Sequence, residues 1–579
     1  SVHLLWRPLD EARLVTVTLL NTQSSDSARS GGVDLATLFE VALECAPGDG
    51  ASITEYPAPL VMELDEEEAE LALLYRHRRV FAVGHGCAAG WDSTDGLSAD
   101  CVRVDWIPRF ETPRLVPVRD EDSEALTLAR LASEADGKAL HRMLSDFIAP
   151  YGRWIEDVAG QNDIPEGLLG AHVWLLVRLR VTEARIRAGI ELLRSDEAAR
   201  VAFGLANAAV RAAILRDSVR QGEPVAPDEI DPDDIGTGRD EPRWFPFQLA
   251  FQLSCLPSLL DPGHPNRGTV DLLWFPTGGG KTEAYLGLAA TAILHRRLTG
   301  GGPGPTVLTR YTLRLLTIQQ FQRTATLICA LEGMRRSRSD LGDRPIRLGL
   351  WIGQDRGTPN SVARAREAIQ ELEAGSGATS PFQVDRCPWC GTTLVVSGEG
   401  GSTVAHGFST PSSHSFLIRC LTDACPFSDE IPVQVVDQAI YSAPPEFIVG
   451  TVDKFAQLPW QEDAGRVLGH GSGLGPSLII QDELHLLTGP LGTMVGVYEM
   501  AVERLIASNG APPKVIASTA TIRRAEDQVR GLFGRDVRAF PPPGARFGES
   551  YFAREADPAD GEPGRLYAGV MPQTQTALF

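Results

Sequence analysis

The sequence has no long hydrophobic run and no visible secretory signal. Its longest apolar stretch, 167–177, is interrupted by His172 and is too short to cross a bilayer, which takes about 20 apolar residues. We therefore expect no membrane attachment and take cytoplasmic residence as the default. The chain opens on Ser1 instead of a start methionine, so we expect an N-terminal piece to be missing.

The sequence also lacks an excess of positive charge. It carries 54 Lys and Arg against 75 Asp and Glu, a formal net charge of −21, whereas phosphate binding normally uses Lys and Arg. The acidic residues concentrate in 63–70 and 223–240, which we interpret as a solvated face and a linker. Segment 296–347 differs, with an excess of about seven positive charges. Its arginines are 296, 297, 310, 314, 323, 335, 336, 338, 344 and 347, against Glu332, Asp340 and Asp343.

Two segments before residue 240 differ in periodicity. Residues 11–120 contain short runs of β-type residues separated by Gly, Ser and Asp turns, whereas 122–218 have helical periodicity. We therefore expect a β-rich module at 1–121, a helical module at 122–220 and an acidic linker at 221–240.

Segment 272–282 is an apolar strand that stops at a glycine-rich turn and a Lys-Thr pair. Backbone N–H groups at such a turn wrap phosphates at a helix N-terminus, where the helix dipole favours negative charge. We expect Lys281 to reach the β- and γ-phosphates of ATP and Thr282 to ligate Mg²⁺. A strict P-loop has glycine where this chain has Phe275, so the motif is a variant. The predicted nucleotide-binding residues of this motif are Thr277, Gly278, Gly279, Gly280, Lys281 and Thr282.

A second apolar strand, 478–481, ends in adjacent carboxylates followed by a histidine. Asp482 would hold the hydration shell of Mg²⁺, and Glu483 would orient and deprotonate the attacking water. His485 would couple the nucleotide state to the neighbouring motif. The two motifs together predict an ATP hydrolysis site whose catalytic residues are Lys281, Asp482, Glu483 and His485.

A third strand, 514–518, delivers hydroxyl groups to a loop, and the order of the three motifs is that of superfamily 2 helicases. The chain resembles the first RecA-like domain of that family. The resemblance implies that Gln248, in the aromatic segment 243–248, reads the adenine edge, with Gln252 as the reserve. It also implies a motif that couples the ATP site to nucleic acid, formed by Ser518, Thr519, Ala520 and Thr521.

The same resemblance places two segments against the nucleic-acid backbone. They follow the apolar strands 306–308 and 447–449, at the positions of motifs Ia and Ib. Arginines without interleaved aromatic residues suit phosphate contacts better than base stacking, although a solvated helix face is the alternative for any single arginine. The predicted DNA contacts are Thr309, Arg310, Arg314, Thr451 and Lys454.

Cysteine is scarce, with nine in the chain, yet four fall in one segment. Two close pairs about thirty residues apart suit two knuckles that clamp one tetrahedral Zn²⁺ ion, whereas two disulfides would need an oxidising compartment. We predict a zinc-binding insertion at 375–430 within a RecA-like ATPase domain at 241–374 and 431–545. Nucleic-acid contact, partner docking and bracing all stay open as its role, and His414 is a spare ligand candidate. The predicted zinc ligands are Cys387, Cys390, Cys420 and Cys425.

The particular residues of the motifs narrow the resemblance to one family. Segments 83–87, 244–250, 275–282 and 482–492, together with the inserted cysteines, resemble the DrmA family, the helicase-like subunits of bacterial DISARM anti-phage systems. The resemblance implies DNA as the substrate, a DrmB-like partner protein and a role against phage DNA. The expected fold class is thus α/β: a RecA-like P-loop ATPase domain with a zinc-ribbon insertion, preceded by a β-rich and an α-helical module.

One departure from the family is large, because the sequence ends at Phe579, before any second RecA-like domain. Arginine fingers of that domain stabilise charge on the transferring phosphoryl group, so we expect 546–579 to be a linker toward it. Two functions stay open. One is an ATP-driven DNA helicase or translocase, with RNA as a weaker alternative substrate. The other is a nucleotide-gated subunit that binds DNA or a partner without unwinding.

Overall fold

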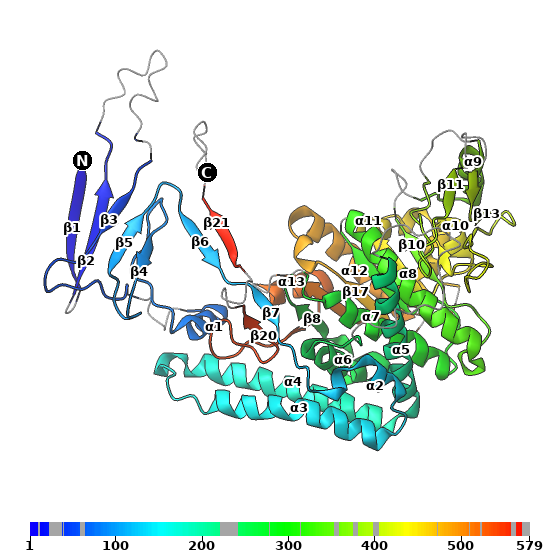
Figure 1. Ribbon diagram of the computed structural model, residues 1–579, viewed down its shortest axis with the longest axis horizontal. Helices are drawn as coiled ribbons and strands as arrows, with labels where there is room; N and C mark the ends of the chain where they lie inside the picture. The colour runs from blue at the N-terminus through cyan, green and yellow to red at the C-terminus, as the bar shows by residue number, and fades with distance from the viewer. Residues whose placement is uncertain are drawn as a thin grey trace, which may run out of the picture. The chain divides into compact units, whose positions relative to one another are not determined.

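The structure is a computed structural model that divides into two compact units (Figure 1). The first comprises 1–114, 165–171 and 555–579, and the second comprises 115–164 and 172–554. The structure describes residues 1–9, 12–22, 38, 40–57, 64–220, 241–276, 278–312, 314–352, 358–374, 380–397, 404–471, 473–508, 510–520, 524–556 and 563–569, without the side chains of 217–220, 314–316, 397 and 404.

The first unit is rich in β-strand. Its elements are β1 (Val2–Leu9), β2 (Ala12–Leu19), β3 (Leu43–Cys45), α1 (Glu66–Tyr75), β4 (Gly90–Asp92), β5 (Cys101–Val104), β6 (Arg109–Thr112) and β21 (Arg565–Ala568). β1 pairs with β2, β5 lies between β3 and β4, and β6 pairs with β21, all antiparallel. The segment expected to be a linker therefore contributes a strand, β21, to the unit that holds the start of the chain.

The second unit contains an eight-stranded sheet in which every pair of neighbours is parallel. In spatial order the strands are β15 (Val433–Gln434), β10 (Leu348–Trp351), β16 (Phe447–Thr451), β9 (Val307–Tyr311), β17 (Leu478–Gln481), β18 (Lys514–Thr519), β8 (Val270–Trp274) and β19 (Val537–Phe540). The central strands are buried on both faces, as parallel strands are when helices cover the sheet on both sides. The predicted α/β class is confirmed. A separate pair joins β7 (Leu115–Pro117) and β20 (Ala553–Glu555).

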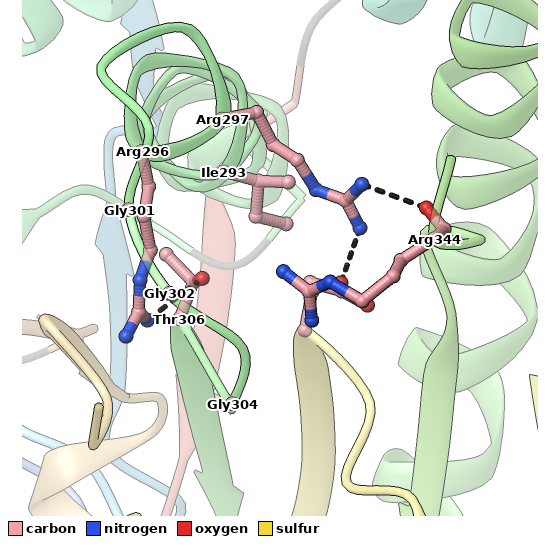
Figure 2. A pocket seen from close by; sticks show the side chains of 9 residues that line it. Ile293, Arg296, Arg297, Gly301, Gly302, Gly304, Thr306 and Arg344 are labelled. Carbon is pink, nitrogen blue, oxygen red and sulfur yellow. Dashed lines mark hydrogen bonds and ion pairs between the residues drawn. The ribbon is translucent and has the colours of Figure 1, made fainter. Parts of the chain in front are cut away.

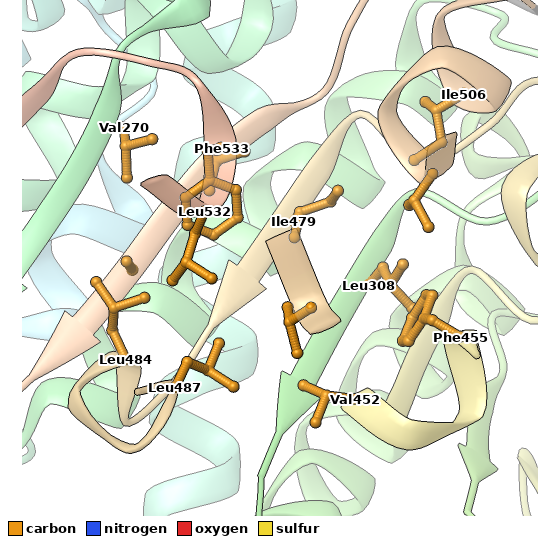
Figure 3. Close-up of a cluster of buried hydrophobic side chains, with 14 of the residues drawn as sticks. Val270, Leu308, Val452, Phe455, Ile479, Leu484, Leu487, Ile506, Leu532 and Phe533 are labelled. Atoms are coloured by element: carbon orange, nitrogen blue, oxygen red, sulfur yellow. The ribbon is translucent and has the colours of Figure 1, made fainter. Parts of the chain in front are cut away.

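Most helices of the chain belong to the same unit as this sheet. They are α2 (Leu128–Ser133), α3 (Gly137–Ala159), α4 (Leu169–Ser195), α5 (Glu197–Arg220), α6 (Pro246–Leu260), α7 (Lys281–Leu298), α8 (Arg314–Ser337), α9 (Val362–Glu373), α10 (Asp437–Ser442), α11 (Val452–Phe455), α12 (Gly489–Ser508) and α13 (Ala525–Phe533). One core cluster joins Leu308 and Ile479 of the sheet to Phe455 of α11, Ile506 of α12 and Phe533 of α13 (Figure 3). These three short or amphipathic helices therefore cover one face of the central strands.

The helices expected to form a separate module belong to the same unit as the sheet. The alanine-rich α5 packs against α2, α7 and α8, because small side chains allow close helix approach. Arg185 of α4 pairs with Asp271 of β8 at 2.7 Å. Among the described residues, α5 is also the one helix whose length and composition would allow it to cross a membrane, and its packing identifies it as a core helix.

The cysteine-rich insertion forms its own small cluster of strands between α9 and β15. It contains β11 (Val395–Ser397) paired with β12 (Val404–His406), and β13 (Phe408–Ser409) paired with β14 (Leu417–Ile418). Phe382 lies 4.5 Å from Phe408 and 4.8 Å from Phe416 between ring centroids, which gives the insertion a small apolar core. The chain then returns to the large sheet as β15.

Candidate nucleotide site and cysteine cluster

The three predicted ATP motifs meet at the carboxyl edge of the sheet. β8, β18 and β17 are neighbours, and each of the three motifs follows or ends one of these strands. Carboxyl ends of parallel strands lie at one edge of a sheet, which is where ligands bind in open α/β folds. Segments more than two hundred residues apart in the sequence are therefore brought to one place by strand order.

The glycine-rich turn after β8 has the backbone that a phosphate loop needs. Gly278 and Gly280 have φ of +84° and +86°, a left-handed conformation that favours glycine, and α7 begins immediately afterwards at Lys281. A Cβ at Gly279 would lie 2.7 Å from the ring of Phe275. The Phe275 ring is fully buried and stacks on Phe247, with 4.2 Å between the ring centroids. This packing explains how position 275, where a strict P-loop has glycine, accommodates a phenylalanine. Thr277 lies outside the described residues.

Lys281 is buried at the start of α7. Its ammonium group donates a hydrogen bond to the carbonyl oxygen of Phe275 at 2.7 Å. Burial lowers the pKa of Lys281, and the carboxylates of Glu483 and Asp482 oppose that shift. The ammonium group of Lys281 therefore has a neutral carbonyl as its bonded partner and is within electrostatic reach of the two acidic residues.

Asp482 is held by donors from three segments. Its Oδ1 accepts hydrogen bonds from the Ser518 hydroxyl and from the Glu483 N–H, the latter at 2.9 Å. Its Oδ2 accepts one from the Tyr285 hydroxyl at 2.7 Å. Tyr285 also lies 3.2 Å from Thr282 Oγ1. The structure thus joins the predicted Mg²⁺ residues, Thr282 and Asp482, through a tyrosine that the sequence analysis did not single out.

Glu483 is in a strained backbone conformation, with φ of +49°, which is uncommon for a residue other than glycine and is found at functional sites. Its Oε2 accepts no hydrogen bond among the described residues, although His485 Nδ1 lies 3.3 Å away. His485 Nδ1 is also 3.4 Å from the Thr519 hydroxyl. A buried carboxylate oxygen that accepts no hydrogen bond among the described residues thus lies beside the coupling motif.

The remaining coupling residues are only partly described. Trp274 Nε1 donates a hydrogen bond to the carbonyl oxygen of Ala520 at 3.2 Å, which ties the end of β18 to the end of β8. Thr521 lies outside the described residues. The structure thus brings Ser518 to Asp482 and Thr519 to His485.

Gln248 lies against the glycine-rich turn. Its Nε2 donates a hydrogen bond to the Gly280 carbonyl at 2.7 Å, and its Oε1 accepts one from the Phe245 N–H at 2.8 Å. Gln252 is fully buried and packs against Gly287 of α7. Gln248 is therefore beside the site, and its reading of adenine stays a prediction.

Two residues predicted to contact DNA are buried, and that prediction needs correction. Arg310 is 1% exposed, and both its terminal nitrogens bond the carboxylate of Glu499 on α12. Lys454 is also 1% exposed and forms an ion pair with Asp437. Glu499 lies 189 residues from Arg310 and Asp437 lies 17 residues from Lys454, so neither ion pair is visible as a local pattern in the sequence.

Two further predicted DNA contacts, Thr309 and Thr451, are no more accessible. Thr309 and Thr451 are buried in β9 and β16, and their hydroxyl groups have no hydrogen-bond partner among the described residues. The side chain of Arg314 is not described. In this structure the side chains of Thr309 and Thr451 therefore do not offer a surface to a phosphate backbone.

Most of the arginine-rich segment is paired in the same way. In Figure 2, Arg297 bonds the carboxylate of Glu446 and the carbonyl oxygen of Arg344, while Arg296 bonds the Thr306 hydroxyl. Further along, arginines pair with acidic residues of α7, of α8, of the turn after α8 or of the insertion. These pairs are Arg323–Glu283, Arg335–Glu332, Arg336–Glu332, Arg338–Asp340 and Arg347–Glu430.

The four predicted zinc ligands lie together. All four cysteines are buried, and their sulfur atoms lie within 4.8 Å of one another. Two of the sulfur pairs, Cys387–Cys425 and Cys390–Cys420, are 3.9 and 3.4 Å apart. A tetrahedral ion with Zn–S bonds of about 2.3 Å has sulfur atoms about 3.8 Å apart. The cluster therefore fits a tetrahedral metal, and it contains cysteine from both predicted knuckles. His414 is exposed and bonds Ser413, so it is not part of the cluster.

The cluster is attached to the helices of the second unit. The Thr326 hydroxyl of α8 donates a hydrogen bond to the carbonyl oxygen of Pro388 at 3.2 Å. The guanidinium of Arg216 on α5 stacks over the ring of Trp389 at 4.7 Å. Pro388 and Trp389 stand between the first two cysteines, so the first knuckle is braced on two core helices.

Comparison with known proteins agrees with the motifs. No family model matches the chain. DISARM protein DrmA of Bacillus paralicheniformis (strain ATCC 9945a / NCIMB 11709 / CD-2) is 34% identical over 563 residues, which cover 86% of this chain. The chain is therefore a relative of DrmA. The resemblance to DrmA expected from the sequence is confirmed, and the chain spans 48% of the length of that DrmA.

Likeness to solved structures is weaker. The crystal structure of DUF1998 helicase MrfA is 14% identical, with a TM-score of 0.30, and the match covers 55% of this chain and 33% of that one. The same helicase bound to DNA and AMPPNP gives a TM-score of 0.31 at 14% identity, covering 58% and 29% of the two chains. These values are too low to transfer a function to the DrmA relative.

Proposed function

We propose that this chain is an ATP-dependent DNA helicase or translocase subunit of an anti-phage defence complex. One observation carries the proposal: Lys281 and Thr282 of the glycine-rich turn lie around the same point as Asp482 and Glu483. The relationship to DISARM protein DrmA supports the defence role. The proposal includes a RecA-like fold for the sheet, DNA as the substrate, a DrmB-like partner and cytoplasmic residence.

The residues present fit Mg²⁺ and a nucleoside triphosphate. Thr282 and Asp482 supply the hard oxygen ligands that Mg²⁺ prefers, and bound Mg²⁺ would neutralise charge on the phosphates. Lys281 would exchange its carbonyl partner, Phe275, for phosphate oxygens. Backbone N–H groups at the N-terminus of α7 would hold the same phosphates.

Glu483 is the proposed base. Its Oε2, which accepts no hydrogen bond among the described residues, would accept a proton from the attacking water as the water oxygen bonds to the γ-phosphorus and the bond to ADP breaks. His485 lies between this carboxylate and the Thr519 hydroxyl. We propose that this contact transmits the nucleotide state to the coupling motif.

The test is ATP hydrolysis by the longest native product of the gene, with and without single-stranded and duplex DNA. Glu483→Gln is the inactive control, because the amide cannot take the proton. DNA-stimulated turnover that is lost in Glu483→Gln supports the motor. Turnover that is absent, or equal in the variant, contradicts it.

A second function deserves the same test: a nucleotide-gated subunit that binds DNA or a partner without unwinding. The burial of Arg310 and Lys454 favours this second function, because both residues were expected to contact phosphates and instead form internal ion pairs. DNA binding that responds to ATP without turnover, and without strand separation, would select this function over the motor.

We also propose that the cysteine cluster holds one structural Zn²⁺ ion in a zinc-ribbon insertion. The fit of the sulfur distances supports this proposal, and the metal would supply folding energy that so small an apolar core cannot. Metal analysis of the purified chain should find one zinc per chain, and none in Cys420→Ser. Cys101→Ser is the matched control, because it changes a cysteine outside the cluster. Equal zinc in both variants would refute the site.

A further inference from the structure

Tyr285 occupies a position that neither motif explains. It lies on α7 one turn after Thr282 and is 1% exposed. Its hydroxyl lies 2.7 Å from Asp482 Oδ2 and 3.2 Å from Thr282 Oγ1. A phenol has one hydrogen, so the shorter contact, to the carboxylate, is the one it donates. The Thr282 hydroxyl then donates to the phenol oxygen.

This arrangement fixes the two Mg²⁺ residues relative to each other. Asp482 is gripped at Oδ1 by Ser518 and Glu483 and at Oδ2 by Tyr285, so the carboxylate cannot rotate freely. Because Thr282 directs its hydrogen toward the phenol, the lone pairs of its oxygen face away from it. Both consequences favour a cation that must meet oxygen ligands in near-ideal geometry, as Mg²⁺ does.

The phenol is enclosed by protein, because Tyr285 is 1% exposed. The hydroxyl of the equally buried Tyr311 lies 3.5 Å away. Tyr311 is the last residue of β9, so the cluster of hydroxyl groups is enclosed by the sheet and α7.

We propose that Tyr285 is a positioning residue for the Mg²⁺ of the bound nucleotide, acting through its hydroxyl on Asp482 and Thr282. The inference rests on the proposed nucleotide site and goes beyond it, because it assigns a role to a residue outside the motifs. Groups that orient metal ligands typically contribute 10- to 100-fold to metal affinity. We therefore expect Tyr285→Phe to raise the Mg²⁺ concentration for half-maximal effect about tenfold.

The experiment follows binding of a fluorescent ADP to the full chain, first in EDTA and then during titration with MgCl₂. Tyr285→Phe keeps the ring and its packing, and a thermal melt confirms that the variant is folded. The expected result is unchanged affinity in EDTA and a Mg²⁺ midpoint about tenfold higher. ADP is used so that hydrolysis does not enter the readout.

Two further variants fix the interpretation. Tyr498→Phe is the matched control, because it removes a hydroxyl that bonds the carbonyl oxygen of Val452 at 2.9 Å, outside the site. Asp482→Asn is the positive control and should lose the Mg²⁺ effect. Tyr285→Phe overturns the inference if its Mg²⁺ midpoint matches that of Tyr498→Phe, if Mg²⁺ acts at lower concentration, or if affinity falls equally in EDTA.

Failure of the proposed function has a different signature. A wild-type chain that binds no ADP in EDTA or in Mg²⁺ would refute the nucleotide site and the inference together. A wild-type chain that shows a Mg²⁺ effect shared equally by Tyr285→Phe would refute the role of Tyr285 alone.

Discussion

The arginine-rich segment 296–347 and the candidate nucleotide site are both strongly charged, yet their charges face different partners. In the segment, guanidinium groups meet carboxylates of the same chain, as Arg297 meets Glu446 and Arg310 meets Glu499. In the site, the Lys281 ammonium donates a hydrogen bond to a neutral carbonyl oxygen, and Glu483 Oε2 accepts no hydrogen bond among the described residues.

This difference distinguishes charged groups that stabilise the fold from charged groups that can bind a ligand. A buried ion pair that satisfies itself holds segments together and has nothing left for a ligand. A polar group that folding leaves unsatisfied costs free energy, and such costs concentrate at functional sites. Local charge density in the sequence does not distinguish the two cases, because the neutralising carboxylate can stand anywhere in the chain.

The largest loss of stability is expected from Glu499→Ala. This substitution leaves the fully buried Arg310 without a partner, which should lower the free energy of unfolding by about 3–5 kcal/mol. Urea denaturation measures the change. Arg310→Met combined with Glu499→Leu is the control and should be far milder, because the pair is replaced by apolar side chains. Equal loss in both would show that packing, not charge, is responsible.

A second test uses the buried Asp271. Burial alone would raise the pKa of Asp271, but Lys514 and Arg185 bring it from 3.8 to about 2. Since the folded pKa is depressed, the stabilisation is complete above about pH 4 and is lost as pH falls toward 2, and it amounts to about 2 kcal/mol.

Asp271→Asn should therefore unfold more easily than wild type at pH 7 by about 2 kcal/mol. At pH 3 the difference should shrink to roughly half, because the unfolded carboxyl is then mostly protonated. Urea midpoints at the two pH values give the measurement. A difference that does not change with pH would mean that the ion pairs of Asp271 are not its source.

A smaller effect is expected at the exposed pair Arg338–Asp340, whose side chains are 39% and 48% exposed. Solvent screens such a pair, so Arg338→Ala should cost about 0.2–1 kcal/mol of unfolding free energy. Thermal melts at low and high salt measure it, and the cost should fall as salt rises. A loss as large as that of Glu499→Ala would contradict the distinction by burial.

The smallest effect on stability should come from the site itself. Glu483→Gln changes a residue whose Oε2 accepts no hydrogen bond among the described residues, so the free energy of unfolding should stay within about 0.5 kcal/mol of wild type. The same variant is expected to abolish hydrolysis. Destabilisation comparable with that of Glu499→Ala would place Glu483 among the structural charges instead.

Prediction from sequence succeeded where a motif is contiguous. The turn at Gly278–Lys281 and the acidic pair Asp482–Glu483 were found because a strand, a turn and the functional side chains follow one another directly. The cluster of four cysteines was predicted because their spacing is typical of the two knuckles of a metal site. Tyr285 was missed, since its partner Asp482 is 197 residues away and a tyrosine on a helix carries no local signal.

The same limit explains the failed DNA contacts. Arg310 follows an apolar strand, as motif Ia residues do, but its partner Glu499 is 189 residues away on α12. The packing of α5 on α7 and α8 was not predicted from the sequence. Periodicity identifies a helix and its apolar face, whereas the identity of the element that covers that face depends on the whole fold.

The α/β class, the glycine-rich turn, the acidic pair and the cysteine cluster could be predicted from the sequence, because each is encoded by neighbouring residues. Which charged side chains form internal ion pairs depends on tertiary contacts and could not be predicted in this way. The tertiary structure placed Asp482, Ser518, Thr282 and Tyr285 around one point and buried Arg310 against Glu499. Strand order and helix packing set those distances, and neither can be read from residue spacing along the chain.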